Sequence, residues 1–322
     1  MKKIKLISIA AGLAASFLLA TASNSASAEW APKGPIKMMI GFKAGGGADT
    51  QARLIAEDLQ ARYGWQVIPE QVTGKGGLNL LNQLKKEPND GTSIGMVVSE
   101  SLTYNLLVAR NTRMTPEDFT PIVSTASFQI GIVGSTDSGW KTMHDVIADA
   151  KAGKTIRFAT FSSRLADFAY MLGNANGVRF NIISTKGAKA ALNGVTAGDY
   201  DIAFAAGIQN NAVKVGDMVN LASAISEPLK ISPEAPMFED LNLKGFNADG
   251  FFLIVAPAGL PEDARKALSS AISEIVNDPS SKSNQYITKS FSGATTYKGE
   301  ELEQKLASFQ ESSEKMLKAI SE

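Results

Sequence analysis

The sequence predicts an α/β protein made of two α/β units with a ligand cleft between them. Three observations favour this class. Short apolar, β-branched stretches alternate with helical patterns, the rhythm starts again near Phe128, and about 294 residues remain once an N-terminal leader is set aside. Such strands, separated by helices of ten to fifteen residues, indicate a largely parallel sheet covered on both faces. A chain of this length has room for a substantial core and about two domains.

In the first half of the chain, strand patterns flank an amphipathic helix. The predicted strands are 36–40, 66–68 and 94–98. The helix between the first two follows Gly45-Gly46-Gly47; Asp49 is placed to cap its start, and Gly64 can take the left-handed exit conformation. Its apolar face consists of residues at helical spacing, namely Ala52, Ile55, Ala56, Leu59 and Tyr63. These elements form the first unit.

A second series repeats this rhythm and leads into a C-terminal helical region. Its predicted strands are 156–161, 178–183, 201–205, 219–224 and 251–255, followed by a helix from about Pro261 and a long helix over 299–320. One face of the long helix is apolar and favours core packing over a partner-binding stripe. That face comprises Leu302, Leu306, Phe309, Met316, Leu317 and Ile320. With chain crossings near Ser124 and Gly250, domain I is 29–124 plus 250–322 and domain II is 125–249.

The N-terminus predicts export. Lysines at positions 2, 3 and 5 precede an apolar run over residues 6–20, and Ala26-Ser27-Ala28 supplies small residues for cleavage near Ala28. This is the pattern of a secretory signal peptide, which predicts a periplasmic protein. The chain has no cysteine, which excludes a lipid-attachment Cys and a disulfide frame. Without the signal lysines the chain has three more acidic than basic residues, which argues against a nucleic-acid partner.

The glycine loop at 45–47 predicts an anion site. The first amides of a helix are unpaired and its N-terminus is electropositive, while glycine lets the backbone approach a ligand closely. A turn with no ligand remains the alternative. A dinucleotide fingerprint fails because Thr50 stands where its last glycine belongs, although Glu70 keeps a weak resemblance. A phosphate loop ending in Gly153-Lys154-Thr155 fails because Ala148 replaces its opening glycine.

A second glycine cluster, Gly74, Gly76 and Gly77, follows the second strand. Adjacent parallel strands bring this loop and the first one together at the carboxyl edge of a sheet, where open α/β folds bind ligands. Two such loops facing one point suit a compact carboxylate. Lys75 either adds charge there or is solvated.

Five stretches in order give the chain a resemblance to a known family. They read "PIKMMIGFKAGGGADTQARLIAEDL", "GWQVIPEQVTGKGGLNL", "EPNDGTSIGMV", "STKGAKAALNGVTAGDYDIAF" and "FFLIVAPAGLPEDARKAL". The chain resembles the periplasmic solute receptors of tripartite tricarboxylate transporters, the Bug or TctC family, over nearly its whole mature length. The resemblance implies a type II periplasmic binding fold that closes on an organic acid and delivers it to integral membrane subunits. It implies no catalysis, and we expect no cofactor and a monomer.

The resemblance also implies ligand-binding residues in domain I. The matching loops hold one ligand carboxylate through backbone amides, and Asp49 either braces its loop or accepts a ligand amine. The implied proximal site comprises Phe42, Gly45, Gly46, Gly47, Ala48, Asp49, Gly76 and Gly77. Ala44 and Ala48 depart from the family pattern, which removes a hydroxyl contact, and Lys43 stands where a small residue is usual.

The opposite wall is expected at the strand-to-helix junctions of domain II. Ser162 and Ser163 lie at a strand end and can cap the next helix. Arg164 lies near a family histidine position; it either clamps a second carboxylate or forms a surface or interdomain ion pair. Thr185 is the favoured side-chain donor. The remaining expected contacts are Lys186, which serves either the ligand or the scaffold, and Ala206.

Enzyme and metal functions lack their residues in this sequence. His144 is the single histidine and falls on a predicted surface helix, and no Gly-x-Ser-x-Gly turn is present. Asp199 and Asp201 are expected to be loop residues rather than metal ligands. An exported nucleotide-dependent α/β enzyme and a ligand sensor for a signalling kinase remain the rival hypotheses. Tricarboxylates, dicarboxylates, aromatic acids and amino acids all fit the family, and Arg164 favours a dicarboxylate.

Overall fold

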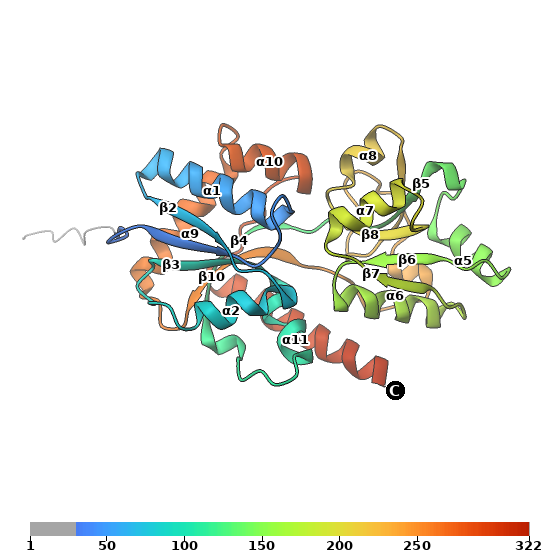
Figure 1. The fold of residues 1–322 in the computed structure, drawn as a ribbon, viewed down its shortest axis with the longest axis horizontal. Helices are drawn as coiled ribbons and strands as arrows, with labels where there is room; N and C mark the ends of the chain where they lie inside the picture. Colours follow the sequence, from blue (N-terminus) through green and yellow to red (C-terminus); the bar gives the residue numbers. More distant parts are fainter. Residues whose placement is uncertain (1–29, 322) are drawn as a thin grey trace, which may run out of the picture.

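The computed structural model describes residues 30–321, which form two lobes side by side, each built on a five-stranded sheet (Figure 1). The predicted signal peptide and its cleavage near Ala28 lie outside the described residues. Within this range, no helix combines the length and the apolar character that a membrane crossing requires.

The first sheet has the strand order β2-β1-β3-β10-β4. Its strands are β1 (Ile36–Ile40), β2 (Val67–Gln71), β3 (Ser93–Val98), β4 (Phe119–Ser127) and β10 (Phe251–Pro257). β1 pairs in parallel with β2 and β3, whereas β10 lies antiparallel between β3 and β4. The strand predicted at 66–68 continues through Pro69, which β2 tolerates because it is an edge strand.

The second sheet repeats this plan in the order β7-β6-β8-β5-β9. Its strands are β5 (Ile130–Ser135), β6 (Arg157–Thr160), β7 (Asn181–Ser184), β8 (Ile202–Ala206) and β9 (Met218–Ser223). β6 pairs in parallel with β7 and β8, and β5 runs antiparallel to both β8 and β9. The strand predicted at 178–183 starts later, at Asn181. The Val178 amide instead donates to the Gly173 carbonyl at the end of the preceding helix, and the Val178 side chain packs in the core.

Both sheets are mixed rather than largely parallel, and the chain crossings explain why. β4 of the first sheet is followed directly by β5 of the second, and β9 of the second leads to β10 of the first. β5 and β10 each start at the boundary between the lobes and run away from it. The other strands of the two sheets end at this boundary, so β5 and β10 are antiparallel to their neighbours. The predicted crossing near Ser124 falls inside β4, which ends at Ser127, while Gly250 directly precedes β10.

Helices cover both faces of the first sheet (Figure 1). On one face lie α1 (Gly47–Tyr63), α9 (Glu262–Asn277) and α10 (Lys282–Phe291), which share a core with Ile36, Met38 and Ile40 of β1. On the other face lie α2 (Leu78–Leu84), α3 (Ser99–Leu102), α4 (Tyr104–Val108) and α11 (Gly299–Ser321). The alternation of β1 side chains between these two cores is the period of a strand buried on both faces.

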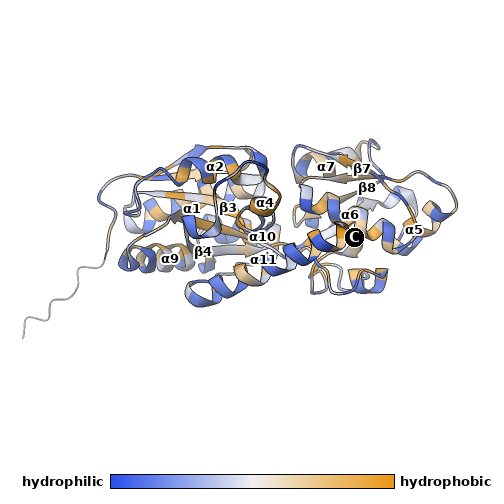
Figure 2. Ribbon diagram, turned by 90° about the horizontal axis from the view of Figure 1, so that it is seen from below, coloured by the Kyte–Doolittle hydropathy of each residue, from blue (hydrophilic) through white to orange (hydrophobic). Residues whose placement is uncertain are grey.

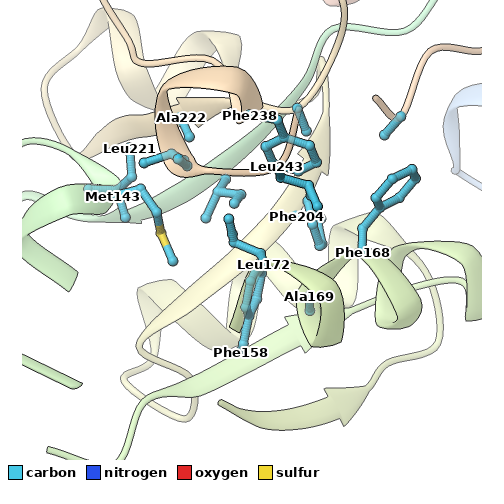
Figure 3. Packing of buried hydrophobic residues seen from close by; sticks show 14 of the residues in the cluster. Met143, Phe158, Phe168, Ala169, Leu172, Phe204, Leu221, Ala222, Phe238 and Leu243 are labelled. Carbon is cyan, nitrogen blue, oxygen red and sulfur yellow. The ribbon is translucent and has the colours of Figure 1, made fainter. Parts of the chain in front are cut away.

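The second sheet is covered in the same way. The larger core lies under α5 (Met143–Lys151) and α6 (Ser163–Ala175), where Phe158 stacks on Phe204 with ring centroids 4.8 Å apart (Figure 3). The smaller core lies under α7 (Ala188–Thr196), with α8 (Asn210–Lys214) at its border. Short 3₁₀ turns complete the elements: η1 (Lys75–Gly77), η2 (Pro116–Asp118), η3 (Thr136–Ser138) and η4 (Phe238–Leu241).

The long C-terminal helix joins the two lobes. Leu302 is buried in the core of domain I, whereas Met316 is buried in the core of domain II and has Leu317 and Ile320 beside it. In Figure 2, α11 lies across the underside of the molecule and ends over the second lobe. Core packing is therefore confirmed for the apolar face of this helix. The helix adds a third connection to the two chain crossings.

An ion pair ties β6 to the start of β8. Asp201 accepts hydrogen bonds from the Arg157 backbone amide at 2.7 Å and from its Nη2 at 2.8 Å. Burial alone raises the pKa of Asp201, but the bonds from Arg157 outweigh it and hold this pKa below its usual range. Such a carboxylate stabilises the fold above its unfolded pKa of about 3.9, and this stabilisation is lost as pH falls through the folded pKa.

We therefore expect Asp201→Asn to lower the melting temperature by a few degrees at neutral pH. The difference from wild type should shrink below about pH 4, because protonation removes the same charge. Thermal melts across the acid range test this. E262Q, which removes an exposed contact of 3.7 Å to Lys266, is the control and should change little. A pH-independent difference for Asp201→Asn would contradict the ion-pair explanation.

Candidate functional site

The predicted ligand residues all lie where strands end and helices begin. Phe42 to Asp49 follow β1, Gly76 and Gly77 follow β2, Ser162 to Arg164 follow β6, Thr185 and Lys186 follow β7, and Ala206 ends β8. The structure brings the two sets of junctions together. The Ser162 hydroxyl, after β6, lies 3.4 Å from the Glu100 carboxylate, after β3. The carboxyl edges of the two sheets therefore face each other across the domain boundary.

The first glycine loop leaves helix amides open for an anion. Gly45 adopts a left-handed φ of +72°, and Gly46 is the N-cap of α1 without any side-chain cap. The first bond into the helix runs from the Thr50 amide to the Gly46 carbonyl at 2.9 Å. The amides of residues 47–49 therefore have no acceptor within the helix, which is the arrangement that binds anions. The Gly64 exit is confirmed, with a φ of +69°.

Asp49 braces this loop instead of capping α1. One of its carboxylate oxygens accepts from the Gly45 amide at 2.9 Å, and the other accepts from Arg53 Nε at 2.9 Å and Gln71 Nε2 at 3.1 Å. Gln71 also donates to the Phe42 carbonyl at 3.2 Å. The buried carboxylate therefore ties the glycine loop to the end of β2. Protein donors occupy both of its oxygens, which favours bracing over contact with a ligand amine.

The second glycine loop is a left-handed turn held from the next junction. Lys75, Gly76 and Gly77 have consecutive φ values of +50°, +62° and +96°. The Gly76 carbonyl accepts from Ser101 Oγ at 2.8 Å and from Asn105 Nδ2 at 3.0 Å. A Cβ on Gly76 would lie 2.4 Å from Asn105 Nδ2, so any larger residue here must displace the Asn105 side chain and adopt a strained φ. The Lys75 side chain is exposed, as is that of Lys43.

The junction after β3 contains candidate residues that the sequence analysis did not predict as ligand contacts. Besides holding Gly76, it carries Glu100 at the domain boundary and Tyr104, whose hydroxyl donates to the Asp167 carboxylate of α6. Burial raises the pKa of Tyr104, and the hydrogen bond to Asp167 adds to this rise. Burial also raises the pKa of Asp167, while the Tyr104 bond opposes it. The only available signal was a run of polar residues, "SESLTYN", directly after an apolar strand.

The structure engages Arg164 within the protein. The side chain is 5% exposed, and its Nη1 and Nη2 donate to the carbonyls of Asp249 at 3.0 Å and Asn247 at 3.1 Å. Its Nε is buried and has no hydrogen-bond partner among residues 30–321, and the guanidinium lies over the Phe168 ring. Residues 247–249 lie in the segment that leads into β10. The two terminal nitrogens of Arg164 therefore link the N-terminus of α6 to this segment. Two protein carbonyls therefore accept from the guanidinium, and the contact between Arg164 and a ligand carboxylate stays a prediction.

Of the other residues predicted in domain II, some are exposed to solvent and others already bond to protein groups. Ser162 caps α6 by accepting from the Leu165 amide at 3.2 Å, which confirms the predicted cap, and Ser163 is exposed. The Thr185 hydroxyl lies 3.1 Å from the Thr160 carbonyl and 3.2 Å from the Gly187 carbonyl, so protein acceptors already surround it. Lys186 is exposed and Ala206 is half-buried at the strand end.

The residues expected to have no chemical role lie away from the junctions. His144 is exposed on α5, Asp199 is exposed, and Asp201 is paired with Arg157. In the range 30–321, no group of three or more His, Cys, Asp or Glu side chains is placed to hold a metal ion.

The amino-acid sequence matches a family of receptors. The profile of the tripartite tricarboxylate transporter family receptor, TctC, matches residues 51–321. A UPF0065 protein of Agrobacterium vitis is 27% identical over 253 residues, which cover 77% of this chain and 73% of the relative.

Solved structures match the fold over most of the chain. The periplasmic binding protein BugD has a TM-score of 0.77 at 22% identity, with 90% of this chain and 99% of that chain covered. A protein of R. palustris solved with adipate has a TM-score of 0.76 at 20% identity, with 90% and 98% covered. The predicted two-domain α/β fold of a periplasmic binding protein is confirmed.

Proposed function

We propose a function from one premise: this chain belongs to the tripartite tricarboxylate transporter receptor family. The family consists of receptors, not enzymes. The chain is then an extracytoplasmic receptor that captures a small organic acid and delivers it to the integral membrane subunits of a secondary transporter. The N-terminal pattern supports export, with cleavage near Ala28 and a periplasmic location for the mature protein. The proposed receptor acts as a monomer.

The observation that carries the proposal is the pair of glycine loops. Unpaired amides at the start of α1 and the left-handed turn at 75–77 lie at the ends of two hydrogen-bonded parallel strands. Backbone amides at a helix N-terminus bind anions without requiring a basic side chain. The proximal site proposed for the carboxylate comprises Phe42, Gly45, Gly46, Gly47, Ala48, Gly76 and Gly77. Asp49 serves it by bracing the first loop.

The second domain completes the site on closure. We assign its contacts to the N-terminal junctions of α6 and α7 and to the end of β8, where Ser162, Ser163, Lys186 and Ala206 lie. A ligand that touches both domains shifts the population toward the closed form, because only that form makes both sets of contacts. The closed form is then what the membrane subunits recognise. The neighbour solved with adipate supports a carboxylate as cargo.

A thermal-shift screen of refolded, ligand-stripped protein tests this function. Mono-, di- and tricarboxylates, aromatic acids, amino acids and nucleotides form the panel. An acid at about 100 times its dissociation constant should stabilise the protein by roughly 2.7 kcal/mol, which raises the melting temperature by several degrees. Stabilisation by one class of acid is the expected result. A response to nucleotides with none to any acid would overturn the proposal and favour a nucleotide-dependent enzyme.

A further inference from the structure

Glu100 lies at the floor of the boundary between the domains. It is the second residue of α3, directly after β3, and its Oε2 is 3.4 Å from the Ser162 hydroxyl of domain II. The neighbouring Ser99 hydroxyl accepts from the Phe251 amide at 3.2 Å, where the chain re-enters domain I. Glu100 therefore lies between the two sets of strand ends, beside the Ser101 hydroxyl that holds the second glycine loop.

The Glu100 carboxylate has unused hydrogen-bonding capacity. A carboxylate offers about four acceptor sites, and the only side-chain hydrogen bond found for Glu100 in the described part of the chain is the long one to Ser162. Burial raises the pKa of Glu100, and the charge of Arg164 and the hydrogen bond from Ser162 oppose this rise. The two terminal nitrogens of Arg164 donate to the carbonyls of residues 247 and 249. Within residues 30–321, Arg164 is the cation whose charge acts on the half-buried Glu100 carboxylate, and the two groups form no salt bridge within 4.0 Å.

Three other carboxylates near the boundary already accept hydrogen bonds from protein groups, whereas Glu100 can accept more from a ligand. Asp49 is occupied by Gly45, Arg53 and Gln71, as described above. Asp167 is engaged by Tyr104, and Asp249 accepts from the amide and hydroxyl of Ser226. Exposed basic side chains also lie on these junctions: Lys43, Lys75, Lys186 and Lys189, besides the Arg53 that pairs with Asp49.

We propose that Glu100 selects the cargo by accepting an ammonium group at the far end of an acid whose carboxylate lies on the glycine loops. The receptor then prefers a zwitterion with one carboxylate over a dicarboxylate of equal length. This inference rests on the proposed function. As the domains close and water leaves, an N–H donor with positive charge satisfies the unpaired carboxylate. A second ligand carboxylate at the same place meets a like charge at low dielectric and is repelled.

Matched ligands test the inference on the full-length mature protein. Isothermal titration compares ω-amino acids of increasing chain length with the dicarboxylates of the same length, including 6-aminohexanoate against adipate. For the wild type, the best zwitterion should bind about tenfold or more tightly than its matched dicarboxylate. Glu100→Gln keeps the size of the side chain and removes its charge, so this preference should disappear or invert. Glu234→Gln removes the same charge from an exposed residue outside the junctions and should leave the preference unchanged.

The outcomes separate this inference from the proposed function. Tighter binding of the dicarboxylate by the wild type, or an unchanged preference in Glu100→Gln, overturns the role of Glu100 while the receptor function stands, because an acid still binds. Failure of every acid to bind the wild type overturns both. The wild-type ranking needs no variant, so the inference stays open to refutation even if Glu100→Gln folds poorly.

Discussion

Replacing Gly76 with alanine is expected to weaken cargo binding by about tenfold or more while the protein remains folded. Gly76 has a φ of +62°, and an L-residue there costs roughly 1–2 kcal/mol. The added Cβ would also lie 2.4 Å from Asn105 Nδ2, the atom that donates to the Gly76 carbonyl. Asn105 must move, and the loop loses one of its two side-chain holds. The amides proposed to bind the carboxylate are then displaced.

A glycine elsewhere separates backbone strain from loss of the site. Gly139 has a φ of +76°, and a Cβ there would have no atom within 4 Å. It follows η3 in domain II, away from the ligand junctions, so Gly139→Ala should show the strain cost alone. Titration calorimetry with the best acid and thermal melts of both variants make the comparison. If Gly76→Ala binds the acid as tightly as wild type does, the second glycine loop is a tight turn without a role in ligand binding.

The glycine loops were predictable because their chemistry is local. The spacing of Gly45 to Gly47 between a strand and an amphipathic helix already indicates a turn followed by unpaired amides. Asp49 was half predicted: its position in the first helical turn suggested a cap, but the structure turns it back to the Gly45 amide. Gln71, another partner of Asp49, is distant in sequence and is brought near by the pairing of β1 with β2.

The domain boundary was not predictable because its contacts are distant in sequence. Arg164 bonds to carbonyls more than 80 residues away, and backbone carbonyls carry no sequence signal. Glu100 lies in a polar stretch of the sequence that gives no indication of its partner, because Ser162 is brought beside it only by the second domain. The crossing was predicted near Ser124, and β4 continues to Ser127. These features depend on tertiary assembly rather than on local periodicity.

Replacing Arg164 with alanine is expected to lower the free energy of unfolding by about 2–3 kcal/mol, a loss of several degrees in melting temperature. The variant leaves two backbone carbonyls of the connection into β10 without their charged donor. It also removes the guanidinium that lies 5.3 Å from the centre of the Phe168 ring, in the largest core of domain II. Arg164→Lys keeps the charge but cannot reach both carbonyls with one ammonium, so it should recover only part of the loss.

Arg179 supplies the matched control for this substitution. It is exposed beyond the C-terminal end of α6, so Arg179→Ala should melt close to wild type. Thermal melts give the stability of each variant, and titrations with adipate and 6-aminohexanoate give its selectivity. If the role of Arg164 is structural, Arg164→Ala melts at a lower temperature than wild type and the ranking of the two ligands does not reverse. An Arg164→Ala protein that melts like wild type but loses dicarboxylate binding would instead make Arg164 the ligand clamp that its position in the sequence suggested. That result would also count against Glu100 as the selecting residue, since a bound second carboxylate needs positive charge where Glu100 supplies negative charge.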